Sequence, residues 1–283
     1  MNGRKQRQKG FVLVLVLAML TIATLLSAGV ARRALDQTVI AAKRSDDLQR
    51  RWGEISLRHA VLNRAEILLR TSELQEGVKR PALQTTVKLG DRTFQLVLSD
   101  EQAKLNVNTA FRYGREPAVR KTLFDGGVLW PIRLRPDPRA TANSPYPPAF
   151  ASWGQVYDFS VFANMPEKNY LQLTGLGERT TCWGNGQLNM NRADSNTIRT
   201  ICELVAPPQS VTALLEQRQA HPDRNFERTI READIPDRDR RAFRQVLTDR
   251  SRCHSLWTIT SDENRSWVRL DVKTDGEMET FYW

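Results

Sequence analysis

The stretch that decides the fold is FVLVLVLAMLTIATLLSAGVA, residues 11–31, which contains no charged side chain. As a helix it would be about 31 Å long, enough to cross the hydrocarbon core of a membrane. The ten residues before it, MNGRKQRQKG, carry four cations and no acid. A basic flank stays on the cytoplasmic side, so we expect one membrane span with the rest of the chain on the outer side. Arg32 and Arg33 oppose this orientation but are outnumbered.

Three interpretations of this stretch compete. A secretory signal peptide would be cleaved after the apolar run, but the run is long for one and the helical pattern continues beyond it. A plain signal anchor fits the length. The junction Lys9-Gly10-Phe11 favours a third, because a short basic leader that ends in glycine before phenylalanine and an apolar run resembles the type IV prepilin signal. The resemblance implies that a prepilin peptidase cuts between Gly10 and Phe11, that Phe11 is methylated, and that the helix is retained.

Leu15 is the fifth residue of that mature chain, where most type IV pilins and pseudopilins carry glutamate. A carboxylate inside a bilayer needs a partner, and in such filaments the resemblance implies the amine of the subunit nearer the tip. A tip subunit has no such neighbour, and the K-type minor pseudopilin of the type II secretion system is the member that lacks the glutamate. Leu15 therefore indicates a tip subunit, unless the segment is no pilin helix and simply needs an apolar residue.

Beyond the span, the apolar residues keep a three- and four-residue spacing to Leu74, with no proline before Pro81. We therefore expect one helix over residues 11–74. From Thr85 the period changes to two, and Gly90-Asp91 between two such runs predicts a hairpin. The same alternation returns near the C-terminus at 256–260, 267–272 and 278–283. These patterns predict an α+β fold, in which the long N-terminal helix packs on an antiparallel sheet that the last strands complete.

A second pattern is an internal repeat, Leu105-Asn106-Val107-Asn108 and Leu188-Asn189-Met190-Asn191. In each copy we expect the last asparagine to cap a following helix, and Asp194 to lie in the first turn of the second helix. Together with their surroundings, residues 100–108 and 182–191, the copies resemble the two signature stretches of the K-type pseudopilin family. The resemblance implies a mainly helical domain inserted into the pilin sheet. Helices are expected at 195–205, 209–220 and 238–249.

These expectations divide the chain into five parts. They are a leader at 1–10, a membrane half of the helix at 11–31, the pilin helix and first strands at 32–108, an inserted loop-rich and helical domain at 109–252, and C-terminal strands at 253–283.

The composition bounds the chemistry. The formal net charge is +10, of which the leader supplies four, and the rest is spread without a single basic run. We interpret this charge first as a solvated surface and second as a patch for nucleic acid or an anionic membrane. Outside the cytoplasm three cysteines allow one disulfide. The sequence does not choose the pair, but Cys182 and Cys202 bracket a compact segment and are favoured.

We find no catalytic motif and expect no enzyme. In the resembled family calcium is associated with the inserted domain, so a calcium ion stays an open alternative, with no ligands assigned. The turn Ala206-Pro207-Pro208 lacks the amides of a helix-hairpin-helix DNA contact, so no nucleic acid is expected.

The resemblance implies a minor pseudopilin at the tip of the type II secretion pseudopilus, held in the inner membrane with its bulk in the periplasm. It also implies I- and J-type minor pseudopilins as partners, and contact with the secretin or with exported proteins. A minor pilin of a type IV pilus and a membrane-anchored nucleic-acid-binding protein are the alternatives.

Overall fold

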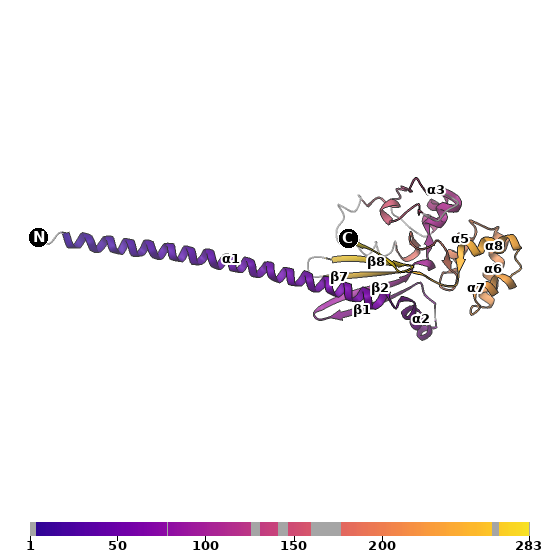
Figure 1. The fold of residues 1–283 in the computed structure, drawn as a ribbon, viewed down its shortest axis with the longest axis horizontal. Coiled ribbons are helices and arrows are strands. Elements are labelled where there is room, and N and C mark those ends of the chain that lie inside the picture. The colour runs from indigo at the N-terminus through magenta and orange to yellow at the C-terminus, as the bar shows by residue number, and fades with distance from the viewer. Residues whose placement is uncertain are drawn as a thin grey trace. The chain divides into compact units, whose positions relative to one another are not determined.

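The apolar stretch forms part of one helix, α1 (Arg4–Leu62), which continues without a break from the leader through residues 11–31 (Figure 1). By length and composition, the segment Phe11–Leu62 can cross a membrane, and its best 18-residue window has a mean hydropathy of 2.7. The computed structural model describes residues 4–77, 79–125, 131–140, 147–159, 177–261 and 266–282, with side chains from residue 11 onward. The chain consists of two compact units, Met1–Ile55 and Ser56–Trp283.

The predicted single helix 11–74 is wrong at one place, because α1 ends at Leu62 and α2 (Ala65–Glu76) begins after a two-residue turn. Arg64, at the start of α2, leaves the helical region with ψ 16°. The Asn63 amide oxygen in the turn accepts a hydrogen bond of 2.9 Å from Lys273 Nζ on the sheet. Leu57 and Leu62 before the break and Leu69 after it all lie in one cluster against the sheet.

The sheet has five antiparallel strands in the order β1-β2-β7-β8-β9 (Figure 1). Their bounds are β1 Ala82–Leu89, β2 Arg92–Asp100, β7 Cys253–Ser261, β8 Ser266–Thr274 and β9 Glu277–Tyr282. The predicted hairpin and the return of the C-terminal strands are both confirmed, since β2 pairs with β7 along its length and Asp100 lies opposite His254. The α+β fold class is therefore confirmed.

Each face of the sheet carries its own core because successive strand residues point to opposite sides. One face, with Phe94, Leu96 and Leu98, packs against the end of α1 and against α2. The other face, with Trp257 and Leu270, belongs to a central cluster that also contains residues of α3 (Val107–Asp125). The sheet thus separates the helix layer from the inserted segment.

The insertion lies between β2 and β7. Its described residues include four two-residue strands, β3 Leu105–Asn106, β4 Thr180–Thr181, β5 Leu188–Asn189 and β6 Leu247–Thr248, and the helices α3, α5 Ser195–Cys202, α6 Pro208–Ala220, α7 Phe226–Glu232 and α8 Asp237–Val246. Measured between the sheet strands it therefore runs from Glu101, earlier than the expected 109. The helices expected at 195–205, 209–220 and 238–249 are present with shorter or shifted ends, whereas α7 was not expected.

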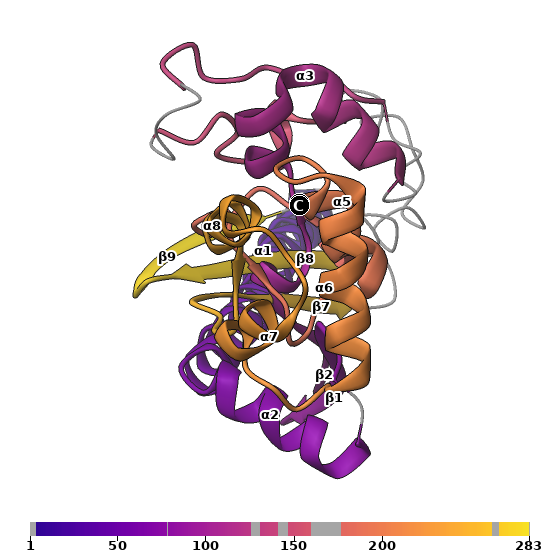
Figure 2. The same cartoon turned by 90° about the vertical axis from the view of Figure 1, so that its right-hand side faces the viewer.

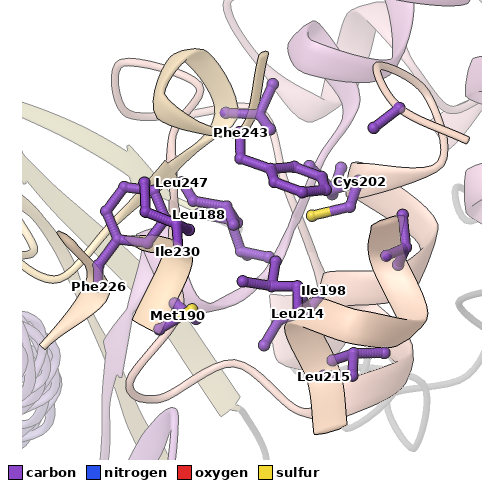
Figure 3. Close-up of a cluster of buried hydrophobic side chains, with 14 of the residues drawn as sticks. Leu188, Met190, Ile198, Cys202, Leu214, Leu215, Phe226, Ile230, Phe243 and Leu247 are labelled. Carbon is purple, nitrogen blue, oxygen red and sulfur yellow. The ribbon is translucent and has the colours of Figure 1, made fainter. Parts of the chain in front are cut away.

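The helices α5 to α8 share a core of their own, and Figure 2 shows them grouped on one side of the insertion. Figure 3 shows its largest side chains converging from all four helices and from the short strands beside them. Ile198, Leu214, Ile230 and Phe243 are completely buried there. Because one residue from each helix meets in this cluster, we treat α5–α8 as one helical subdomain.

Candidate functional site

The two copies of the repeat adopt the same local geometry. Leu105 and Asn106 pair in parallel with Thr180 and Thr181, and Leu188 and Asn189 pair in parallel with Leu247 and Thr248. In each copy the first asparagine accepts a hydrogen bond from the backbone N–H two residues later, at 2.9 Å in the first copy and 3.0 Å in the second. The second asparagine of each copy donates to the carbonyl of the residue directly after the bridge partner, Cys182 or Asp249. The repeat is thus a structural unit used twice.

This geometry corrects the expected caps. Asn106, rather than Asn108, accepts from the first N–H groups of α3, those of Asn108 and Thr109. In the second copy Asp194 is itself the cap of α5, since it accepts from the Thr197 N–H at 2.9 Å. Asn108 instead donates to the carbonyl of Phe150. The second asparagine of each pair therefore connects segments distant in sequence instead of starting a helix.

Between the repeats and the sheet lies a cluster of charged and polar side chains that we call the polar junction: Glu66, Glu73, Asp100, Asn189, Arg192 and Ser251. Asp100, Asn189 and Arg192 are buried, Glu73 and Ser251 are half-buried, and Glu66 is exposed. Arg192 is 6% exposed and follows directly on the second repeat. Its guanidinium donates to Glu73 at 2.6 Å, to Glu66 at 2.7 Å and to Asp100 at 3.1 Å. Because Glu66 and Glu73 lie on α2 and Asp100 ends β2, one side chain joins the helix layer, the sheet and the insertion.

Asp100 has the fullest set of partners in the junction. Its carboxylate accepts from the Gln102 N–H at 2.9 Å and from Asn189 Nδ2 at 3.0 Å, in addition to Ser251 and Arg192. A completely buried carboxylate is stable only with such compensation. Asn189 links the junction directly to the repeat, since the same side chain also caps the turn after β5.

The charges in the junction perturb each other. The hydrogen bond with His254, followed by that with Arg192, lowers the pKa of Glu66 to about 2. The same carboxylates hold the pKa of Arg192 above its ordinary value although burial acts against the charged form. Glu66 therefore stays ionised at any physiological pH, and the junction is a permanent ionic connection instead of a proton-transfer site.

A second buried ion pair, between Lys104 and Glu101, lies in the segment that follows β2. Lys104 is 2% exposed, and its ammonium group lies 2.5 Å from Glu101 Oε1, which also accepts from the Ser255 hydroxyl. Both charges come from the segment that connects β2 to the first repeat. A buried pair of this kind adds little net stability, but removing one partner leaves an uncompensated buried charge and is strongly destabilising.

The residues that the sequence singled out lie in three different places. Gly10, Phe11 and Leu15 all lie on α1, and the Leu15 side chain is 48% exposed. Cys182 lies in the central cluster and Cys202 in the helical subdomain. Neither is bonded to the other, so the structure does not contain the favoured disulfide: all three cysteines are free and buried, and burial raises their pKa values. The bracketed segment is compact, but its two ends face separate cores.

Among the described residues, no group of three or more His, Cys, Asp or Glu side chains is placed to hold a metal ion. The acids of the polar junction surround the Arg192 guanidinium, which already supplies the cation. His254 is the one histidine in this region, and its Nε2 lies 3.4 Å from Glu66. The arrangement can hold three structural layers together.

Among solved structures, the chain is similar to a chain of the GspK-GspI-GspJ complex from the type 2 secretion system of enterotoxigenic Escherichia coli. The match covers 86% of this chain and 98% of that chain, with a TM-score of 0.45 and 15% sequence identity. No protein-family profile matches the chain, and no curated protein matches it.

Proposed function

We propose that this protein is a K-type minor pseudopilin that initiates or caps the pseudopilus of a type II secretion system, for protein export across the outer membrane. The observation that carries the proposal is α1, which runs from the cationic leader through the Gly10-Phe11 junction and the whole apolar stretch as one helix. A prepilin peptidase removes residues 1–10 and methylates Phe11. The retained helix then anchors the subunit in the inner membrane, with the bulk of the chain in the periplasm.

The anchor has a face suited to contact with other helices. Between residues 21 and 31, helical periodicity places Thr21, Thr24, Ala28 and Ala31 on one side of α1, and the larger Ile22, Leu26 and Val30 on the other. Small side chains let helix backbones approach closely in a membrane. Lateral packing through this face would bring the subunit together with the I- and J-type minor pseudopilins.

Leu15 supports the position at the tip. An ordinary subunit gains from a glutamate at this place by pairing it with the amine of the next subunit, whereas a subunit with nothing above it would leave the carboxylate unpaired in the membrane. The head, which we define as residues 56–283, is the part of a tip subunit that would meet the secretin or exported proteins first. Catalysis has no part in this proposal.

Co-purification tests the proposed partners. The full chain, produced together with the I- and J-type subunits of the same gene cluster and extracted in a mild detergent, should elute with both as one complex. A test variant replaces Thr24 and Ala28 with leucine. The substitution keeps the segment hydrophobic but blocks close approach of another helix, so it should reduce recovery of the partners. Elution of the wild-type chain alone under these conditions would contradict the proposal.

A further inference from the structure

β9 is the outermost strand of the sheet, and Figure 2 shows it at the outer edge beside β8. Asp275 and Gly276 form the two-residue turn before it, both with positive φ (49° and 96°), so Thr274 and Glu277 are a hydrogen-bonded pair. Hydrogen-bonded and non-bonded pairs alternate along an antiparallel ladder. The backbone N–H and C=O groups of Met278 and Thr280 therefore point away from β8, and no described strand pairs with them.

The same edge is acidic. Glu277 and Glu279 are both exposed and lie on one face of β9, because strand residues alternate. Within the described part of the chain, neither carboxylate has an ion-pair partner, whereas the nearby Asp275 pairs with Arg252 at 3.8 Å. The next residue on that face, Phe281, contacts Trp183 with ring centroids 5.6 Å apart. The edge thus presents two acidic side chains without an ion-pair partner in the described chain, next to the aromatic pair Phe281 and Trp183.

A cavity of about 170 Å³ opens beside these residues. Glu277 and Glu279 line it on the β9 side, and the other walls include Phe111, Pro147, Pro148 and Trp183. Trp183 is 7% exposed, and its indole N–H has no acceptor among the described residues. An engineered apolar cavity of about 150 Å³ holds a benzene molecule, so this one has room for a side chain of the size of leucine or phenylalanine.

We propose that β9 is a docking edge for a basic β-strand of another protein chain. The incoming strand would pair with the open backbone groups of Met278 and Thr280, as in other cases of strand addition. Its lysine or arginine side chains, at alternating positions, would lie opposite Glu277 and Glu279, and an apolar side chain at its end would enter the cavity. The inference rests on the head alone and is independent of the proposed function.

Charge argues against a second copy of this chain as the occupant. Antiparallel pairing of β9 with β9 of a second copy would set Glu277 and Glu279 against the same acids, and like charges opposite each other are destabilising. The other edge strand, β1, offers one cation, Lys88, on its length. A strand with cations at several alternating positions complements Glu277 and Glu279 better than β9 or β1 of a second copy would.

The test uses the purified full chain in an uncharged detergent and three labelled seven-residue peptides. The first peptide alternates lysine with valine, leucine and threonine; the second has glutamate in place of lysine; the third keeps lysine but carries N-methyl groups on its pairing amides. Fluorescence anisotropy gives the dissociation constants. We expect the lysine peptide to bind, and the other two to bind at least about fivefold more weakly, from the loss of cross-strand charge pairs or of backbone pairing.

The double variant Glu277→Lys/Glu279→Lys should reverse the preference so that the glutamate peptide binds better. Lys88→Glu on the opposite edge is the matched control and should leave all three dissociation constants unchanged. Circular dichroism checks that each variant is folded; the substituted side chains are exposed or partly exposed.

Three results would overturn the proposal: no binding of the lysine peptide at millimolar concentration, equal binding of the N-methylated peptide, or a preference that the double variant does not change. Sedimentation velocity without peptide addresses the second copy. If the wild-type chain forms a dimer that Met278→Pro dissociates, then the edge is a self-association surface and the proposed occupant is wrong.

Discussion

Replacing Arg192 with methionine removes the cation of the polar junction while keeping most of the side-chain volume. The substitution abolishes the hydrogen bonds to Glu66, Glu73 and Asp100. Removing one partner of a buried ion pair costs about 3–5 kcal/mol because the remaining charge stays desolvated. Here Glu66 is 53% exposed and can be hydrated, whereas Glu73 and Asp100 are 16% and 0% exposed. Since Asp100 keeps three other donors, we expect the free energy of unfolding to fall by about 3 kcal/mol.

Urea denaturation of the full chain in detergent, followed by tryptophan fluorescence, measures this loss. For a unit of this size the expected change corresponds to a melting temperature lower by about 6–12 °C. Arg244→Met is the matched control, because it removes a bidentate pair with Glu227 in which both side chains are about half exposed. Exposed pairs contribute at most about 1 kcal/mol. If both variants lose equally little, the polar junction does not hold the layers together and the reasoning from burial fails.

Three further predictions concern the anchor and the junction. Mass spectrometry of the mature protein should show a chain that begins at Phe11. Replacing Gly10 with a bulky residue should block this cleavage. An intact leader in the wild-type protein would contradict the prepilin assignment. Leu15→Glu should give no gain in assembled pseudopili or secreted protein and a loss similar to that of the control Leu17→Glu; a clear gain would mean that a neighbour lies above this subunit. Because the pKa of Glu66 is lowered from 4.5 to about 2, the stabilisation it supplies is complete above pH 4.5 and disappears as the pH falls towards 2. After discounting for its exposure, we expect about 1–2 kcal/mol of acid-sensitive stability, and a flat profile over this interval in urea titrations would contradict it.

Elements with local periodicity were predictable from the sequence. The long run of apolar residues predicted a helix by its length. The alternating segments on both sides of the insertion predicted the strands, because a strand with one buried face has an apolar residue at every second position. The break between Leu62 and Ala65 was not predictable, because the apolar spacing continues across it: Leu62 and Leu69 are seven residues apart, which places them on one face of an unbroken helix. The structure shows both leucines in one cluster against the sheet.

The candidate site was only partly predictable. The repeat identified the asparagines, and Arg192 was visible as the next residue after the second copy. The partners of Arg192, which are Glu66, Glu73 and Asp100, lie about 90 to 130 positions earlier in the sequence. Contacts between residues so far apart produce no periodic pattern that could be recognised in the sequence. The cysteine pairing failed for a related reason: proximity in sequence did not reveal that Cys182 and Cys202 face different cores.

The pairing of β2 with β7 constrains when the head can be completed. Residues 101–252 separate the two strands, and closing a chain of that length costs about 4–5 kcal/mol in entropy before any strand contact forms. The hairpin β1–β2 is synthesised early, but β2 can pair with β7 only after nearly the whole remaining chain has been made. During that interval β2 is an unprotected sheet edge. We therefore expect the helical subdomain, whose contacts are local, to fold first and shorten the effective loop, and the sheet to close last and slowly.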